Sequence, residues 1–460
     1  MTKPYYLDKM GLKDKSTVVD GNFKKVLMIA FAFPPMGGAG VQRSLKFAKY
    51  LPDFHWLPVI IKADLLDGNA KDYSFLKELN NNIKIHNSFC PQLKFFRNGR
   101  TNIHKNVEFL KKNSRFINNL IQMIKTLIFI PDRNVAWLPF VLIKAIKVIK
   151  EDKIDLIYTT SDPYADHLIG YLLKKLTGKP WVADFRDPWT DDISHSNEYY
   201  QAPFGKFRKR IDLALEKKVI KHADCVVGTT EEIVVSFLGR YPKETQEKCL
   251  TITNGYDEED FLGQGRCPSR EDGRFTICYS GSFARSPDNF LVALKKLLDD
   301  NNALRREIRV IFAGYMPSGV RECIGQLKLE DQVDLIGYVP HKESIEYLLR
   351  SDVLLLNLTS DERERLILPG KIFEYMRAKK PILALVPKGA AAEIINKYRI
   401  GNVVDPDNVV GISNVIEEMY YKYKRGSLKI EPVGAIDNFE RKKLTRKLAD
   451  CFNELIEAEI

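Results

Sequence analysis

Short apolar runs without polar alternation recur along most of the chain, and most are followed by a segment whose apolar residues have helical spacing. Such runs are typical of strands buried on both faces of a parallel sheet, and the segments between them are typical of the covering helices. The pattern therefore predicts the α/β fold class. Because 460 residues exceed what one hydrophobic core usually holds, we expect more than one domain.

The apolar runs form two series, separated by a polar, acidic stretch at 256–272. The first series predicts strands at 25–30, 58–61, 154–160, 181–185, 223–228 and 249–252. The second predicts strands at 275–280, 309–313, 333–336, 353–358, 381–386 and 401–404. We therefore predict an N-terminal domain at 1–255, a linker at 256–272, a second domain at 273–435 and a terminal segment at 436–460 that carries an amphipathic helix.

The composition is that of a soluble globular protein, with 45% hydrophobic and 28% charged residues. The seven cysteines are scattered and show no zinc-ligand spacing, which favours buried thiols in a reducing compartment. The polar N-terminus has no apolar leader, and no run of 18 apolar residues occurs. We expect a cytoplasmic protein without a spanning helix or a signal peptide.

Positive charge is concentrated in the segment 94–150, which holds twelve Lys or Arg and two acidic residues and accounts for most of the net charge of +11. The same segment carries many large apolar residues, a combination typical of binding to an anionic membrane surface. The alternatives are a solvated basic face over an ordinary core and a nucleic-acid partner. We do not expect nucleic acid, because no known nucleic-acid-binding motif accompanies the charge.

A glycine turn follows the first predicted strand, in the sequence Phe-Pro-Pro-Met-Gly-Gly at 33–38. Gly37 and Gly38 would allow the backbone to approach a phosphate or a sugar closely. The turn is not GxGxxG, and no acidic residue ends the second strand, so a nicotinamide cofactor is not favoured. A tight turn required only for packing is the alternative.

Charged residues and a tryptophan lie around the end of the predicted strand 181–185, namely Asp184, Arg186, Asp187 and Trp189. Ligands of parallel sheets bind beyond the carboxyl ends of the strands. Carboxylates and a guanidinium can hold sugar hydroxyls, and an indole can stack on a sugar face. An Arg–Asp pair that only holds the loop together is the alternative.

Lys371 and Glu374 lie on one face of the first turn of a predicted helix at 371–378 that follows Pro369 and Gly370. A helix N-terminus favours a phosphate, and a lysine there adds positive charge. A glutamate one turn on can accept hydrogen bonds from two vicinal hydroxyls. The pair predicts a site for a nucleoside diphosphate and its ribose, with an ordinary ion pair within one helix as the alternative.

Seven short motifs follow one another in a fixed order over about residues 24–455, at 33–38, 183–189, 253–257, 279–282, 312–314, 337–340 and 368–376. With these motifs the chain resembles the glycosyltransferases of family 4. The resemblance implies the GT-B fold, in which two Rossmann-like parallel-sheet domains face each other across a cleft and a C-terminal helix packs back on the N-terminal domain.

The resemblance also implies an activity, in which a sugar of the hexosyl type moves from a nucleotide-sugar donor to an acceptor with retention and without a metal or other cofactor. The expected acceptor is a glycan or lipid-linked sugar in bacterial cell-surface polysaccharide synthesis. Together with the basic segment 94–150, this places the protein on the inner face of the cell membrane as a peripheral protein.

By the same resemblance, Glu374 would bind the ribose diol, and the backbone at Gly337, Tyr338 and Val339 would meet the base. Gly37, Gly38 and Gly281 would approach the donor. Lys371 and Arg285 would neutralise the diphosphate, whose charge rises as the glycosidic bond breaks. The catalytic candidates are Arg186, Asp187, Asp184, Lys371 and Arg285.

The family often has a second glutamate eight positions before Glu374, where this chain has Leu366. Glu362 and Glu364 lie nearby but out of register. Only Glu374 is therefore assigned from this motif.

Two cationic positions also depart from the family pattern. Asn289 lies where a diphosphate-binding lysine is common, and Arg186 lies where a catalytic-site histidine is common. His167 is a further candidate for that role. The departures leave two rivals open, a sugar-nucleotide epimerase or hydrolase of the same fold and a non-catalytic partner subunit.

Overall fold

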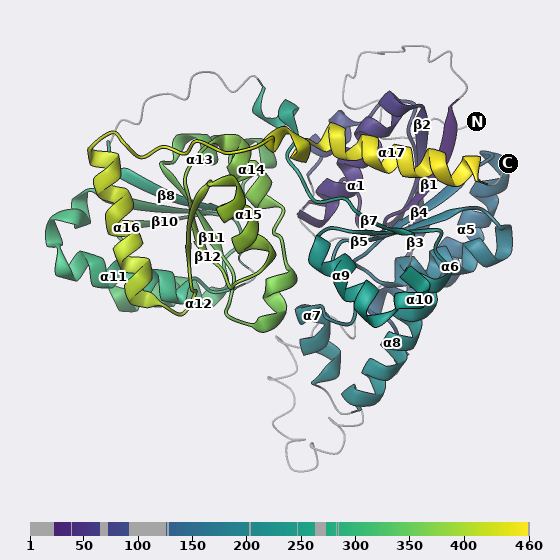
Figure 1. Ribbon diagram of the computed structural model, residues 1–460, viewed down its shortest axis with the longest axis horizontal. Helices are drawn as coiled ribbons and strands as arrows, with labels where there is room; N and C mark the ends of the chain where they lie inside the picture. Colours follow the sequence, from purple (N-terminus) through teal and green to yellow (C-terminus); the bar gives the residue numbers. More distant parts are fainter. Residues whose placement is uncertain are drawn as a thin grey trace.

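The computed structural model describes residues 23–37, 39–64, 72–91, 126, 128–201, 204–245, 247–262, 273–281, 283 and 285–458. Within these residues the chain forms two α/β halves, each built on its own parallel sheet (Figure 1). Gly38 and most of the basic segment, 92–125 and 127, lie outside the described residues.

The strands of the first sheet are β1 Lys24–Ile29, β2 Trp56–Asp64, β3 Lys84–Phe89, β4 Leu156–Thr160, β5 Trp181–Phe185, β6 Cys225–Gly228 and β7 Cys249–Thr251. Their order in space is β3-β2-β1-β4-β5-β6-β7. All neighbouring pairs are parallel. Six of these strands were predicted. The sequence analysis missed β3, because this edge strand is largely exposed and has no continuous apolar run.

Helices cover both faces of the first sheet. The longer ones are α1 Ala39–Tyr50, α5 Leu138–Glu151, α6 Ala165–Thr177, α8 Gly205–His222, α9 Glu231–Arg240 and α17 Arg441–Glu457, and the short ones are α7 Ile193–His195 and α10 Pro242–Thr245. Apolar residues of α5, α6, α8 and α9 form one core with one face of the sheet. Those of α1 and α17 form a second core on the other face.

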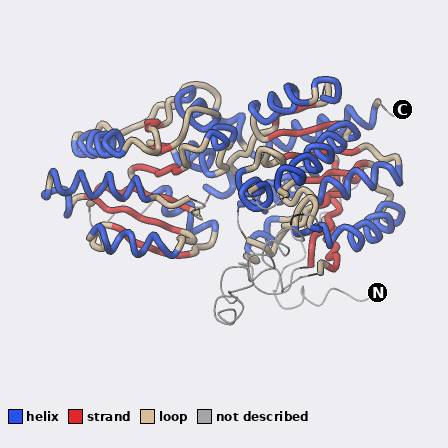
Figure 2. The backbone as a smooth tube through the Cα atoms, turned by 90° about the horizontal axis from the view of Figure 1, so that it is seen from below, coloured by secondary structure: helices blue, strands red, loops and turns tan. Residues whose placement is uncertain are grey.

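The second sheet contains β8 Phe275–Ser280, β9 Ile308–Ala313, β10 Val333–Gly337, β11 Val353–Asn357, β12 Ile382–Leu385 and β13 Gly401–Val404. Their order is β10-β9-β8-β11-β12-β13. The surrounding helices are α11 Asp288–Asp300, α12 Ser318–Leu327, α13 His341–Arg350, α14 Lys371–Ala378, α15 Ala390–Tyr398 and α16 Val409–Lys424. Figure 2 shows the two sheets as separate groups of strands, each flanked by helices.

The last helix, α17, follows the second half in sequence but packs on the first (Figure 1). Its residues Leu444, Leu448 and Phe452 are buried beside the first sheet. The ring of Phe452 lies 5.1 Å from the ring of Trp56, centroid to centroid. The predicted return of the C-terminal helix to the N-terminal half is confirmed.

The start of the predicted linker is held in place by ion pairs. Asp257 precedes a short helical turn at 258–261 and Asp260 lies within it. Both carboxylates form ion pairs with Lys46 of α1. The carboxylates of Asp257 and Asp260 are therefore neutralised by lysines of α1. Residues 263–272 lie outside the described part of the chain.

Candidate active site

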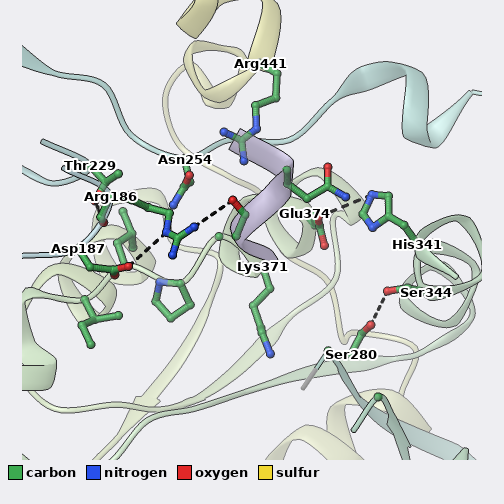
Figure 3. Close-up of a pocket in the computed structure, with 18 of the residues that line it drawn as sticks. Arg186, Asp187, Thr229, Asn254, Ser280, His341, Ser344, Lys371, Glu374 and Arg441 are labelled. Atoms are coloured by element: carbon green, nitrogen blue, oxygen red, sulfur yellow. Dashed lines mark hydrogen bonds and ion pairs between the residues drawn. The ribbon is translucent and has the colours of Figure 1, made fainter. Parts of the chain in front are cut away.

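A cavity of about 460 Å³ lies between the carboxyl ends of the two sheets (Figure 3). From the first half it is lined by residues that follow β5, β6 and β7, among them Arg186, Thr229 and Asn254. From the second half it is lined by residues that follow β8, β10 and β11, among them Gly281 and Tyr338. This is the edge at which parallel sheets bind ligands.

Lys371 begins α14 and lines the cavity. Its Nζ lies 3.6 Å from the ring centroid of Tyr279, and no carboxylate of the described residues forms an ion pair with it. Burial lowers the pKa of Lys371 to about 7, although the field of Glu374 opposes this shift. A lysine so close to neutrality would gain strongly from a bound anion.

Glu374 lies one turn further along α14 and also lines the cavity. Its Oε1 is 4.0 Å from Nε2 of His341, whose ring also lies 3.1 Å from Oδ2 of Asp260. Burial raises the pKa of Glu374, and the field of His341 opposes that rise. The carboxylate keeps hydrogen-bonding capacity that no described protein donor uses.

Arg285 lines the cavity and donates through Nε to Oε1 of Glu364 at 2.5 Å. Glu364 is almost fully buried and also accepts from the backbone N–H of Thr359 at 2.9 Å. Glu364, which is out of register with the second glutamate of the family pattern, thus orients Arg285 toward the cavity.

On the opposite wall, Arg186 connects three segments of the first half. It donates from Nη1 to the carbonyl of Gly40 at 2.9 Å and from Nε to Oδ2 of Asp187 at 3.2 Å, and Nη2 bonds to Asp162. Arg186 and Asp187 both line the cavity. The pair therefore holds the loop together and still faces the ligand space (Figure 3).

Two family models match the sequence. The model described as Glycosyltransferase Family 4 matches residues 104–260, and the model described as Glycosyl transferases group 1 matches residues 268–425. Together they cover more than half of the chain. The chain is a glycosyltransferase of the family 4 kind.

Solved structures confirm the GT-B fold of this glycosyltransferase. Sucrose-phosphate synthase from Thermosynechococcus elongatus aligns with a TM-score of 0.63 at 13% identity, covering 95% of this chain and 100% of that one. The apo form of the lipopolysaccharide outer core galactosyltransferase WaaB gives 0.53 at 14% identity, covering 95% and 100%. MnaA from S. aureus in complex with UDP gives 0.52 at 13% identity, covering 95% and 97%. A search of curated sequences finds no significant match.

The glycosyltransferase does not present Asp184 to the cavity, which corrects its assignment as a catalytic candidate. Asp184 is fully buried, and its carboxylate accepts from Nε of Arg43 at 2.7 Å and from Nη2 of Arg43 at 2.8 Å. The hydroxyl of Tyr158 also donates to it. Asp184 lies within β5 with its side chain in the interior, whereas Asp187 lies in the loop that follows the strand.

Two aromatic candidates are also structural. Trp189 is buried and stacks on Tyr164 with ring centroids 5.2 Å apart. His167 is buried against Phe185, and burial lowers its pKa to about 3. Neither residue lines the cavity of the glycosyltransferase.

The glycine assignments have different outcomes. Gly281 lines the cavity with φ of +112°, and a Cβ added there would lie 3.2 Å from Nζ of Lys371. Gly337 ends β10 with φ of +81° and leads into Tyr338 and Val339, which line the cavity. Gly37 is not among the lining residues, and Gly40 takes that place. The assignment of Gly38 falls outside the described residues.

Several lining residues of the glycosyltransferase were missed, and the polar ones include Asp72, Asn254, His341 and Arg441. Asn254 and His341 could have been suspected, because Asn254 lies within the motif at 253–257 and His341 directly follows the motif at 337–340. Arg441 had no local signal, since it is the first residue of a helix that looks amphipathic and basic.

Among the described residues, Glu78, Asp257 and Asp260 form the one acidic group close enough to hold a metal ion. The ammonium of Lys46 already lies between them, 2.7 Å from Glu78, 2.7 Å from Asp257 and 2.8 Å from Asp260. The charge that a metal would supply is thus provided by a lysine, and the group is structural.

Proposed function

We propose that this glycosyltransferase moves a hexosyl group from a nucleoside diphosphate sugar to a glycan or lipid-linked acceptor, with retention, in cell-surface polysaccharide synthesis. The observation that supports the donor site is that Lys371 and Glu374 lie on one face of α14 and both line the cavity between the two sheets. Retention and the polysaccharide role are supported by the resemblance to family 4.

The residues of the second half fit the chemistry of the leaving group. Negative charge builds on the diphosphate as the glycosidic bond breaks, and cations placed at that point stabilise the transition state. Lys371 at the N-terminus of α14 and Arg285 both line the cavity, and the charge of Arg285 acts on Lys371. In this proposal these groups hold the diphosphate and neutralise its negative charge.

The first half supplies the groups that face the sugar and the acceptor. Arg186 is fixed by Gly40, Asp162 and Asp187, so its guanidinium plane cannot turn freely. The carboxylate of Asp187 remains partly exposed at the cavity wall. We propose that this pair binds hydroxyl groups of the transferred sugar or of the acceptor.

Mutation of the donor site tests the proposal. We expect Lys371→Ala and Glu374→Ala each to reduce sugar transfer by about 100-fold or more, as for a lost leaving-group or donor contact. Lys397→Ala on the exposed side of α15 is the matched control and should keep the wild-type rate. Wild-type rates in both cavity variants would remove the nucleotide site. Donor turnover close to the best rate without any acceptor would instead indicate an epimerase or hydrolase.

We also propose that the protein docks on an anionic membrane through the basic segment 94–150. Most of that segment lies outside the described residues, but its middle is held against α8. Buried Arg208 donates from Nη1 to the carbonyls of Thr126 at 2.6 Å and Phe129 at 2.8 Å. This part of the segment therefore lies beside the start of α8.

The start of α8 has the composition of a membrane-binding surface. Phe204 and Phe207 are 57% and 53% exposed, and they alternate with exposed Lys206, Lys209 and Arg210. Exposed aromatic rings next to lysines are typical of proteins that bind lipid headgroups without crossing the bilayer. In the described part of the chain, no helix has the length and apolarity required to span a membrane.

Sedimentation with phosphatidylglycerol vesicles tests the membrane proposal. Charge reversal at Lys105, Lys111, Lys112 and Arg115 should abolish sedimentation, and Phe207→Ser should weaken it. Reversal of two charges on the other half, at Lys295 and Lys296 of α11, is the control and should leave sedimentation unchanged. Unchanged sedimentation of the first variant would show that the segment is a solvated basic face.

A further inference from the structure

Two side chains that line the cavity carry buried polar atoms without a hydrogen-bond partner among the described residues. These atoms are Oδ2 of Asp72 and Nη1 of Arg441. Buried polar groups are nearly always hydrogen-bonded in folded proteins, because an unpaired group has lost its hydrogen bonds to water without gaining any within the protein. An unpaired buried atom that faces a cavity therefore points to a ligand.

Arg441 is the stronger indicator of the two, because its group is charged and only 5% exposed. It is the first residue of α17, and its backbone N–H donates to the carbonyl of Tyr256 at 2.8 Å. The backbone is thus held, while the side chain reaches into the cavity on the side of Asn254 and Glu374 (Figure 3). It makes no ion pair within 4.0 Å with any described carboxylate.

The charges around Arg441 show which part of a ligand it meets. Burial and the field of Arg43 lower the pKa of Arg441 to about 10, while the field of Glu374 raises it. Arg441 and Glu374 thus attract each other without an ion pair within 4.0 Å, and both side chains line the cavity. Lys371 points away from Arg441, toward Ser280 (Figure 3). The diphosphate belongs at Lys371, and the nucleoside belongs at Glu374 and Arg441.

We infer that Arg441 binds the ribose of the donor together with Glu374. A hydroxyl group carries one donor and two acceptor lone pairs. The Glu374 carboxylate can accept from the ribose hydroxyls, and the Arg441 guanidinium donates to their oxygens. This inference rests on the proposed nucleotide site and adds a residue from the helix that packs on the other half.

The inference has a structural consequence for the enzyme. Glu374 lies on α14 of the second half, whereas α17 packs in a core of the first half. A ribose held between Glu374 and Arg441 therefore connects the two halves. Donor binding would in this way hold the two halves together across the cavity.

Binding of ribose analogues tests the assignment. The nucleoside diphosphate is first chosen from UDP, GDP, ADP and CDP by thermal shift, and its affinity is then compared with those of its 2′-deoxy and 3′-deoxy forms by calorimetry. We expect the wild type to lose about tenfold or more in affinity for at least one deoxy form, as for a hydrogen bond to a charged group. In Arg441→Met this preference should fall at least about fivefold, and Arg441→Lys should restore part of it.

Arg446→Met is the matched control, because Arg446 is an exposed arginine on the same helix, stacked on Phe54 outside the cavity. It should keep the wild-type preference. A wild type that binds the ribo and deoxy forms equally would overturn the inference, even if Arg441→Met did not fold. A wild-type preference retained in Arg441→Met would overturn the role of Arg441 and leave the nucleotide site standing. If none of the four nucleotides bound to the wild type, the proposed function itself would fail.

Discussion

Lys46 and Lys371 are both withdrawn from solvent, yet their surroundings are opposite. Lys46 of α1 lies among the carboxylates of Glu78, Asp257 and Asp260. Although burial alone lowers the pKa of Lys46, these three carboxylates raise it. Lys371 of α14 has an aromatic ring beside it and no ion pair with a carboxylate of the described residues, and burial lowers its pKa.

Two arginines repeat the same contrast. Arg43 is buried and donates to the carboxylate of Asp184 and to the carbonyls of Ile252 and Thr253, whereas Arg441 is buried with Nη1 unpaired among the described residues. A buried cation with its partner inside the protein stabilises the fold. A buried cation without one raises the free energy of the empty protein and is compensated when an anion or an oxygen-rich ligand binds. The difference separates structural cations from functional ones.

The largest expected effect is on stability at the neutralised site. Lys46→Met removes the cation that three buried or half-buried carboxylates share, although Asp257 keeps Lys49 and Asp260 keeps His341, and we expect a loss of about 3 kcal/mol in the free energy of unfolding. Chemical denaturation measures this. Lys442→Met, at a half-exposed position on α17, should change it by less than about 0.5 kcal/mol. An unchanged midpoint in Lys46→Met would break the comparison.

At Lys371, which has no ion-pair partner among the described residues, we expect a substitution to change the free energy of unfolding in the opposite direction. Lys371→Met removes a poorly solvated cation, so the protein without donor should become about 1 kcal/mol more stable while sugar transfer is lost. Thermal unfolding without and with nucleoside diphosphate measures both effects. The ligand should raise the midpoint of the wild type but not of the variant. A variant less stable than the wild type without ligand would show that Lys371 is structural.

The smallest expected effect is the uptake of a proton when the nucleotide binds. The pKa of Lys371 is about 7 in the empty protein, and a bound diphosphate should raise it. At pH 8 the wild type should therefore take up close to one proton with the nucleotide, and Lys371→Met should take up none. Calorimetry in buffers of different ionisation enthalpy measures the uptake.

The same pKa predicts a pH dependence of stability. A lysine in the unfolded chain has a pKa of about 10.4, so the unfolded state binds more protons than the folded state between that value and 7. The contribution of Lys371 should make the donor-free protein more stable as pH rises from about 7 toward 10. In Lys371→Met that part of the slope should disappear. A wild-type slope in the variant would contradict the assignment.

The architecture could be predicted because its signals are local. Continuous apolar runs and helical spacing predicted both sheets, and the one strand missed, β3, is an exposed edge strand without such a run. Lys371 and Glu374 could also be predicted to lie together, because residues three apart in a helix share a face whatever surrounds them. The roles of the charged residues around the end of β5 were harder to predict. The sequence alone does not distinguish Asp184, which is buried, from Asp187, which lines the cavity.

What the sequence by itself determined is therefore the order of elements, the two-sheet fold and the helix start that presents Lys371 and Glu374. Only the tertiary structure decided which charged residues are neutralised, because their partners come from distant segments, as Arg43 does for Asp184 and Asp260 for Lys46. It also decided that Arg441 reaches the cavity. Local patterns depend on the neighbours of a residue along the chain, whereas the balance of charge around a buried group depends on everything that folding brings within a few ångströms of it.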